Sequence, residues 1–506
     1  MTNEPGPFTV KDLIFNGNQD PDHHAIESPG HRPLTYRDLR EQILSVVKTL
    51  NARGYRRNDR IAVITPAGPE AAVITVSVMT GFTCIPLNHQ NRVPEYEDCF
   101  SQLRVQAIIV QEGSETAATR VAKARNIPVI ELTPVSGTAG RFELKPPMAG
   151  DQKEAEFATP SDISYVFLTS GTTSRPKSVP VSQQQTYFIQ QINCRTFRLN
   201  DADRCLHIVP YYHGLGIGPP LLSVLLAGGT VICPRDFIPS DFLHLLKTCR
   251  PTFYPAVPAL HQGILRQIEK VPPEELKNNS LRFIRSGSAS LPEPVRRRLE
   301  TLLGVPVIEV FAMSEAGIIS VNMPQRPGSV GIPVIECVKI VDENGDSLGQ
   351  YEEGEIVIRG EVVFSGYEDA LDENKTAFMD GGFRTGDIGY LDTDGYLFLT
   401  GRKKELINKG GRKIAPAEID SVLMSHDGVR DAMAFSIADP VLGEDIAVMV
   451  VPEGEGVTET ELRRYLLDHL IQFKIPKKIY FVDEIPRNAT GKPLRQAGTE
   501  RYGRSP

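Results

Sequence analysis

A run of small hydroxyl side chains follows an apolar strand between Tyr165 and Lys177. It reads Tyr-Val-Phe-Leu-Thr-Ser-Gly-Thr-Thr-Ser-Arg-Pro-Lys, so backbone N–H groups, hydroxyls and a lysine converge on one place. Such donors suit a polyphosphate. The Gly-Lys-Ser/Thr ending of a Walker loop is absent, because Pro176 stands where its second glycine would be. Alone, the stretch predicts either a phosphate-binding loop or a solvated turn, and the rest of the chain has to decide.

The elements before this stretch alternate between helices and strands. Thr35 can cap a helix with Asp38 at its third position, and apolar residues then recur at helical spacing from Leu39 to Leu50. Apolar strands are predicted at residues 61–64, 107–110 and, briefly, 129–130, with helical stretches between them. This alternation predicts an α/β fold with mostly parallel sheets.

The second half of the chain has a different pattern of predicted elements. Residues 354–360 and 396–400 are predicted strands separated by turns, which indicates a small antiparallel sheet. A charged segment bounded by glycines, residues 401–411, predicts a domain boundary. The remaining residues predict a compact α+β unit, with helices at 417–424 and 459–470 and strands at 432–437 and 446–451.

Composition excludes several classes of protein. The chain has 506 residues, 41% hydrophobic and 23% charged, with a net charge of −8, which is typical of a globular protein and unsuited to nucleic acid or an anionic membrane. Seven scattered cysteines without a Cys-x-x-Cys pair predict reduced, mostly buried thiols and a cytoplasmic location. Residues 205–234 carry no charged side chain, but glycines and prolines interrupt them, so we expect buried core rather than a membrane span.

Motifs along nearly the whole chain resemble the adenylate-forming superfamily of acyl-CoA and aryl-CoA ligases, luciferases and adenylation domains. They are Leu-Thr-Tyr-Arg-Asp-Leu at 34–39, the hydroxyl-rich loop, Phe-Ala-Met-Ser-Glu at 311–315, Thr-Gly-Asp at 385–387, Gly-Arg at 401–402, Gly-Gly at 410–411 and Asn-Ala-Thr-Gly-Lys at 488–492. The stretch 281–291 is most similar to the branch that contains oxalate-CoA and 4-coumarate-CoA-ligase-like enzymes.

The resemblance implies a fold and a two-step reaction. Residues 1–400 would form an N-terminal core of mixed sheets with helices plus a small antiparallel barrel-like subdomain, 401–411 a hinge, and 412–506 a small mobile α+β domain with the catalytic lysine. A carboxylate would attack the α-phosphate of MgATP to give an acyl-adenylate and pyrophosphate, and a thiol would then displace AMP. The implied cofactors are ATP, Mg²⁺ and CoA, or the phosphopantetheine of a carrier protein.

The resemblance also assigns the nucleotide site. Lys492 would neutralise charge developing at the α-phosphate, and Glu315 would help to hold Mg²⁺, which prefers oxygen ligands. The ribose would be bound by Asp387 and Arg402. Each of these side chains could instead be an ordinary surface charge. The phosphates would be held by Thr169, Ser170, Gly171, Thr172, Thr173, Lys177 and Ser314, and the adenine by Ser288, Ala289, Val310, Phe311 and Ala312.

The second half-reaction requires other residues. His213 would lie near the carboxylate and the thiol tunnel, unless it is a hydrogen-bonded core histidine. Lys404 takes the hinge position, and Gly410 and Gly411 would supply backbone that a pantetheine arm can approach. The plain alternative is an exposed linker.

The expected acid is an aromatic or medium-sized aliphatic monocarboxylate. Relatives that activate amino acids have Asp where His213 stands, and a buried ammonium without that partner would be costly. Oxalate-CoA ligases have a His that Ile318 replaces here. The predicted acyl pocket is apolar and consists of Tyr212, Leu215, Val257, Gly287, Gly317 and Ile318.

Three functions remain open. The leading prediction is an acid-CoA ligase. Asn408 stands where some aryl-CoA ligases have Lys, which favours a carrier protein as the alternative acceptor. A silent nucleotide-binding relative is the third, and the retention of Lys177, Glu315, Asp387, Arg402 and Lys492 argues against it.

Overall fold

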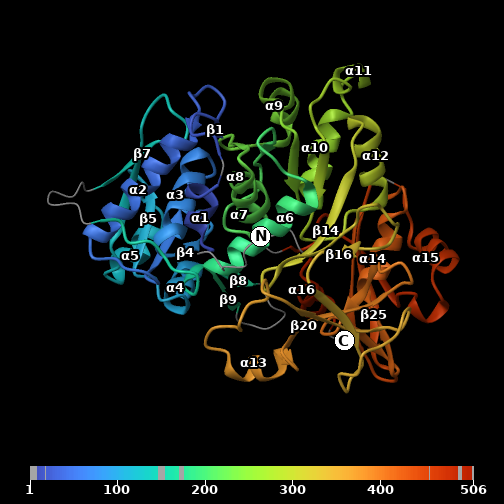
Figure 1. Ribbon diagram of the computed structural model, residues 1–506. Coiled ribbons are helices and arrows are strands. Elements are labelled where there is room, and N and C mark those ends of the chain that lie inside the picture. Colours follow the sequence, from blue (N-terminus) through green and yellow to red (C-terminus); the bar gives the residue numbers. More distant parts are fainter. Residues whose placement is uncertain are drawn as a thin grey trace.

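A computed structural model describes residues 8–17, 19–145, 154–169, 176–454, 456–487 and 493–503 (Figure 1). In this part of the chain, four sheets and the helices packed on them form the fold. Two large sheets belong to the first two thirds of the chain, and two smaller sheets follow in sequence. No helix of the described residues is long and apolar enough to cross a membrane.

The first large sheet has seven strands in the order β7-β6-β5-β3-β4-β8-β9, and its four central pairings are parallel. Thr35 caps α2 by accepting a hydrogen bond from the Asp38 N–H at 3.2 Å, as predicted. All residues of α3 are buried, so this helix lies inside the core. The elements are α2 (Tyr36–Ala52), β3 (Arg60–Ile64), α3 (Pro69–Gly81), β4 (Thr83–Pro86), α4 (Val93–Gln102), β5 (Ala107–Gln111), α5 (Ala117–Ala124), β6 (Val129–Pro134), β7 (Phe142–Lys145), β8 (Ile163–Thr169) and β9 (Lys177–Ser182).

The second large sheet has nine strands in the order β16-β15-β14-β13-β12-β10-β11-β1-β2, and the strands from β14 to β1 run parallel. Helices α9, α10 and α12 pack on one face through one apolar cluster, and α6 and α8 share a larger cluster with the opposite face (Figure 1). The elements are α1 (Val10–Phe15), β1 (His24–Glu27), β2 (Leu34–Thr35), α6 (Gln183–Phe197), β10 (Arg204–Leu206), α7 (Gly214–Ile217), a π-helix (Gly218–Leu222), α8 (Ser223–Ala227), β11 (Thr230–Ile232), a 3₁₀ turn (Pro239–Asp241), α9 (Phe242–Cys249), β12 (Phe253–Ala256), α10 (Pro258–Ile268), α11 (Pro273–Leu276), β13 (Phe283–Ser286), α12 (Glu293–Leu303), β14 (Val307–Met313), β15 (Gly317–Val321) and β16 (Ile332–Pro333).

The third sheet is antiparallel, as predicted, with the order β17-β18-β20-β19 and β21 paired to β20. The fourth sheet, near the C-terminus, has the order β23-β22-β25-β24, with β26 paired to β25. The elements are β17 (Cys337–Val341), β18 (Gly354–Arg359), α13 (Leu371–Ala377), β19 (Phe378–Met379), β20 (Gly382–Leu391), β21 (Leu397–Arg402), β22 (Ile407–Lys409), β23 (Arg412–Ile414), α14 (Pro416–Met424), β24 (Val429–Asp439), β25 (Gly443–Pro452), α15 (Glu459–His469), a 3₁₀ turn (Gln472–Lys474), β26 (Lys478–Phe481) and α16 (Arg495–Tyr502).

The third sheet ends at Arg402 and the fourth begins at Ile407, so the change of sheet falls inside the predicted hinge. An ion pair of 3.2 Å between Lys413 Nζ and Glu343 Oε1 joins the fourth sheet to the loop after β17. On the C-terminal side of the hinge, Arg495 contacts both Glu405 (3.0 Å) and Asp420 (2.7 Å). The division into residues 1–400, 401–411 and 412–506 itself stays a prediction.

Two expectations need correction. The strand expected only at residues 129–130 extends to Pro134, because β7 pairs with its second half from Glu131 onward. The cysteines are free, but they are not mostly buried: Cys84, Cys205 and Cys233 are buried and the other four are partly exposed.

Candidate active site

The strand pair β8–β9 presents the ends of the hydroxyl-rich loop. Thr169 ends β8 and Lys177 begins β9, and the two residues are opposite each other in antiparallel register. The Thr169 hydroxyl donates to the Lys177 carbonyl at 3.4 Å. Ser170, Gly171, Thr172 and Thr173 lie outside the described residues. The described geometry of this loop is therefore that of Thr169 and Lys177, which flank it.

Lys177 lies beside an aromatic ring that the sequence did not single out. Its Nζ is 4.3 Å from the centre of the Tyr367 ring, within reach of a cation–π contact. The Tyr367 hydroxyl donates to Glu315 Oε1 at 2.8 Å. Lysine, tyrosine and glutamate thus form one connected group, although the lysine and the glutamate come from different sheets.

Glu315 lies in the turn between β14 and β15 and is only 8% exposed. Its backbone carbonyl accepts the Phe364 N–H at 2.8 Å, which fixes this turn against the segment that carries Tyr367. Burial raises the pKa of Glu315, and the Tyr367 hydrogen bond acts in the opposite direction. Burial also lowers the pKa of Lys177, and the neighbouring Lys404 adds to that effect. A shifted acid and a shifted base close to one another are typical of a functional site.

Asp387 and Arg402 are opposite each other on β20 and β21. Arg402 Nε donates to Asp387 Oδ1 at 2.7 Å, and Asp387 is 4% exposed. Burial alone would lower the pKa of Arg402, but the charge of Asp387 more than offsets this and raises it. The charge of Arg402 lowers the pKa of Glu315 and the charge of Asp387 raises it, so the pair is close enough to belong to the same group. The predicted ribose and metal residues are thus brought together.

The predicted adenine and acyl residues gather at one edge of the nine-stranded sheet. Val257 follows β12, Gly287 and Ser288 follow β13, and Val310 lies in β14, all in neighbouring parallel strands. The carboxyl ends of parallel strands are the usual place for a ligand. Ser288 and Ala289 are exposed, Val310 is buried, and Phe311 is half-buried. Ala312 is exposed and Ser314 is half-buried, both on the chain that leads to Glu315.

The remaining acyl-pocket residues divide into two groups. Tyr212 and His213 precede α7, with ring centres 4.5 Å apart, and Leu215 in α7 is the side chain nearest to a Cβ placed on Gly287, at 3.7 Å. Gly317 (φ +68°) and Ile318 begin β15. A Cβ on Gly317 would be 2.7 Å from the Ile189 side chain, and Ile318 is 2% exposed, so both pack on α6 and the core.

The hinge and thiol residues surround the fourth sheet. Lys404 is exposed in the turn that follows Arg402. Gly410 and Gly411 form the turn between β22 and β23 with φ of +58° and +84°, a conformation that favours glycine. The Gly410 N–H donates to the Leu442 carbonyl at 2.9 Å. Lys492, the predicted catalytic lysine, lies outside the described residues.

The donor set fits a nucleotide with a hard cation. The described residues contain no group of three or more His, Cys, Asp or Glu side chains that could hold a metal by themselves. One buried carboxylate, Glu315, instead lies beside cations that suit phosphates, which matches the way Mg²⁺ is bound through one or two carboxylates and substrate phosphates.

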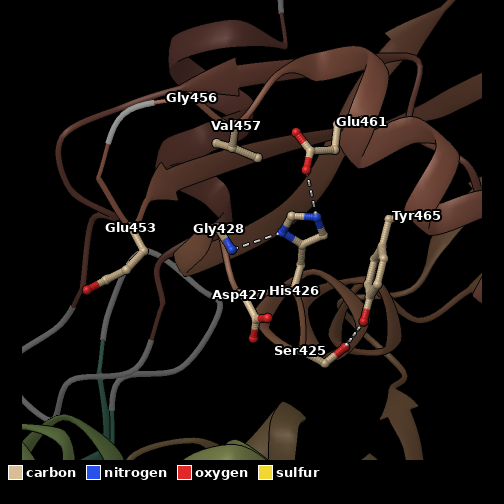
Figure 2. A pocket seen from close by; sticks show the side chains of 9 residues that line it. All are labelled: Ser425, His426, Asp427, Gly428, Glu453, Gly456, Val457, Glu461 and Tyr465. Atoms are coloured by element: carbon tan, nitrogen blue, oxygen red, sulfur yellow. Dashed lines mark hydrogen bonds and ion pairs between the residues drawn. The ribbon is translucent and has the colours of Figure 1, made fainter.

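A separate hollow of about 610 Å³ lies on the C-terminal unit (Figure 2). His426 is its central side chain, with Nδ1 accepting the Gly428 N–H at 3.0 Å and Nε2 at 3.5 Å from Glu461. None of the predicted site residues that the structure describes lines it. The hollow is therefore distinct from the group around Glu315.

Comparison with known proteins decides the family. The AMP-binding enzyme family matches residues 15–368, and the AMP-binding enzyme C-terminal domain matches residues 418–492. The chain belongs to the AMP-binding enzyme family. Its relatives in this family include a probable CoA ligase, CCL9, from Humulus lupulus, which is 38% identical over 95% of this chain and 94% of the relative. An oxalate–CoA ligase from Arabidopsis thaliana is 35% identical over 98% and 99% of the two chains.

Solved structures agree with this assignment. ATP-bound MatB from Rhodopseudomonas palustris superposes with a TM-score of 0.86 and 27% identity, over 98% of this chain and 99% of that chain. An o-succinylbenzoate CoA synthetase from Bacillus subtilis, solved with ATP and a magnesium ion, has a TM-score of 0.82 and 25% identity over 97% and 98%. The fold expected of an adenylate-forming enzyme is confirmed, and this AMP-binding enzyme is an AMP-forming acid–CoA ligase. ATP, Mg²⁺ and CoA follow as cofactors, with a carboxylic acid as substrate.

Proposed function

We propose that this enzyme transfers the AMP group of ATP to a carboxylic acid at the group around Glu315, with release of pyrophosphate, and then passes the acyl group to CoA, with release of AMP. The observation that carries the proposal is the convergence of five side chains from separate segments: Lys177, Glu315, Tyr367, Asp387 and Arg402. The cations suit phosphates, and the buried carboxylate suits a divalent cation. Bound Mg²⁺ would neutralise charge on the phosphates.

Each residue has a role in this proposal. Lys177 binds the outer phosphates together with the hydroxyls of Thr169, Ser170, Thr172 and Thr173, and Ser314 binds the α-phosphate. Asp387 accepts hydrogen bonds from the ribose hydroxyls, while Arg402 holds Asp387 in place. Tyr367 orients the Glu315 carboxylate. Lys492 stabilises the charge that develops between the acid and the α-phosphate, and His213 lies by the reacting carboxylate.

Two classes of acid are candidates. The apolar residues of the predicted pocket favour an aromatic or medium-sized aliphatic monocarboxylate. The names of three relatives, oxalate–CoA ligase, sulfoacetate–CoA ligase and 2-succinylbenzoate–CoA ligase, instead describe acids with a second anionic group. The acceptor is CoA in this proposal, with a carrier-protein phosphopantetheine as the alternative. A cytoplasmic location and the lack of a nucleic-acid partner stay predictions.

Pyrophosphate release from MgATP tests the function. We expect release that depends on one class of carboxylic acid and that CoA accelerates. Acids of aryl, fatty, keto, dicarboxylic and amino type, each with and without CoA, form the panel. Acid-dependent release that ignores CoA would favour a carrier protein, and no release with any acid would contradict the proposal.

The hinge gives a separate prediction. Lys404→Pro removes the backbone freedom that a rotation of the C-terminal unit needs, because proline fixes φ. We expect acyl-adenylate formation to be retained and thioester formation to fall by roughly 10²-fold. Single-turnover assays of the two half-reactions measure this. The exposed Lys403 pairs with Glu355, so Lys403→Ala serves as the neighbouring control. Normal thioester formation in Lys404→Pro would refute the hinge.

A further inference from the structure

Arg285 is a guanidinium buried inside the nine-stranded sheet. It lies in β13, is 3% exposed, and its Nε and Nη1 have no hydrogen-bond partner among the described residues. Burial lowers its pKa to about 9, so the side chain is a cation at neutral pH. A buried cation without a counter-charge is costly, because it has lost its water and gained no partner.

The groups around Arg285 do not compensate for the loss of hydration of its cation. Its Cζ is 5.2 Å from the centre of the Phe197 ring, and among the described residues the titratable neighbour that affects its pKa is the thiol of Cys205. The pKa of that thiol is raised by burial, so Cys205 is uncharged. The aromatic face attracts the cation but accepts no directed hydrogen bonds from its N–H groups.

Arg285 is placed on the face that the acid would occupy. It is two residues before Gly287, and alternate residues of a strand point to one face, about 7 Å apart along the strand. That face is covered by α7 at Gly287, through Leu215, and by α6 at Arg285, through Phe197. One turn earlier on α6, Asn193 is 2% exposed and its Oδ1 has no partner among the described residues. The Asn193 Nδ2 donates to the Ile189 carbonyl at 2.9 Å, so its free atom is an acceptor, and the unsatisfied donors for an anion belong to Arg285.

We propose that Arg285 binds a second anionic group at the far end of the acid, so that the substrate is a short dicarboxylate or a sulfonated carboxylate. The reacting carboxylate then lies by Gly287 and His213, the apolar residues contact the carbon chain, and the distal anion accepts hydrogen bonds from Nε and Nη1. This assignment rests on the proposed function, and it reverses the expectation of a monocarboxylate drawn from Ile318.

The test compares matched acids. Wild-type enzyme is assayed for pyrophosphate release with the dicarboxylates from oxalate to adipate and with sulfoacetate, each beside the monocarboxylate of equal length that ends in a methyl group. We expect kcat/KM for the best dianionic acid to exceed that for its monocarboxylate by on the order of 10²-fold or more, since the buried cation is unpaired with the latter.

Two variants locate the preference at this residue. Arg285→Met keeps an unbranched apolar chain in place of the arginine stem and removes the guanidinium and its charge, so we expect the preference to disappear or reverse. Arg285→Lys keeps the charge and should retain a reduced preference, which guards against a folding defect in the first variant. Arg282→Met is the matched control, because Arg282 lies in the same segment, is exposed and pairs with Asp203. It should leave the preference unchanged.

A binding assay separates this inference from the proposed function. The shift in melting temperature that each acid produces is measured in the absence of ATP. Stabilisation of wild type, but not of Arg285→Met, by a dianionic acid would support the inference even if no acid released pyrophosphate. A preference for monocarboxylates, or an unchanged dianion preference in Arg285→Met, would overturn it. Pyrophosphate release with monocarboxylates alone would retain the proposed function and reject the inference.

Discussion

Glu315→Gln should slow acyl-adenylate formation by roughly 10²- to 10³-fold while the protein stays at least as stable as wild type. Glutamine has almost the same shape as glutamate and can still accept the Tyr367 hydrogen bond, so the packing of the turn between β14 and β15 is preserved. The carboxylate charge next to the phosphates is lost, and with it the anionic oxygen ligand that Mg²⁺ prefers.

The stability part of this prediction follows from the direction of the pKa shift. Burial raises the pKa of Glu315 in the folded protein, so the folded state binds the proton more tightly than the unfolded state. The free energy of unfolding therefore falls as the pH rises from the unfolded pKa to the folded one. Above that window the ionised carboxylate destabilises the fold, and the neutral glutamine does not.

Glu355→Gln is the matched comparison, because Glu355 is equally buried but paired. Its carboxylate contacts Arg384 and, at 3.1 Å, Lys403, and its pKa is lowered despite burial. This variant should lose stability and keep the rate of the chemical step. Melting temperatures at pH 7 and single-turnover rates measure both variants. A large loss of stability in Glu315→Gln with an unchanged rate would show that Glu315 is structural.

Lys492→Ala should reduce acyl-adenylate formation by at least about 10³-fold while ATP still binds. A lysine cation at the α-phosphate acts on charge that develops in the transition state, so its loss affects kcat more than the affinity for ATP. Pyrophosphate exchange measures the first half-reaction, and nucleotide binding is measured by calorimetry.

Two controls test whether the effect is specific to Lys492 and to the first half-reaction. Lys478→Ala removes an exposed lysine of β26 on the same unit and should leave both assays unchanged. Acyl-adenylate supplied from outside should still be converted to thioester by Lys492→Ala, because the second step does not use this cation. A normal rate of adenylation in Lys492→Ala would reject its catalytic role.

Local sequence signals gave good positions for most of the elements that they predicted. The cap at Thr35, the helix that starts at Pro416 and the helix that starts at Glu459 agree with the expected positions to within one residue. The strand at 129–134 was underestimated, since its second half is stabilised by pairing with β7 rather than by its own apolar pattern. Pairing partners distant in sequence leave no local signal.

Only those site residues that belong to short sequence motifs could be predicted. Glu315, Asp387 and Arg402 stand in motifs and are found together. Tyr367 was missed because it reaches Glu315 from 52 residues away, in a segment without a motif. Arg285 was missed because an arginine in a strand is normally exposed, and its burial depends on α6 packing over it.

The ion pair between Lys413 and Glu343 adds little to the stability of this orientation of the C-terminal unit. Both side chains are well exposed, 62% and 85%, so the pair contributes at most about 1 kcal/mol and weakens with salt. One kcal/mol changes the ratio of two arrangements by only about fivefold. The binding of nucleotide, acyl group or thiol can therefore outweigh this contact. Which ligand occupies the site then determines the orientation of the C-terminal unit, and so the order of the two steps.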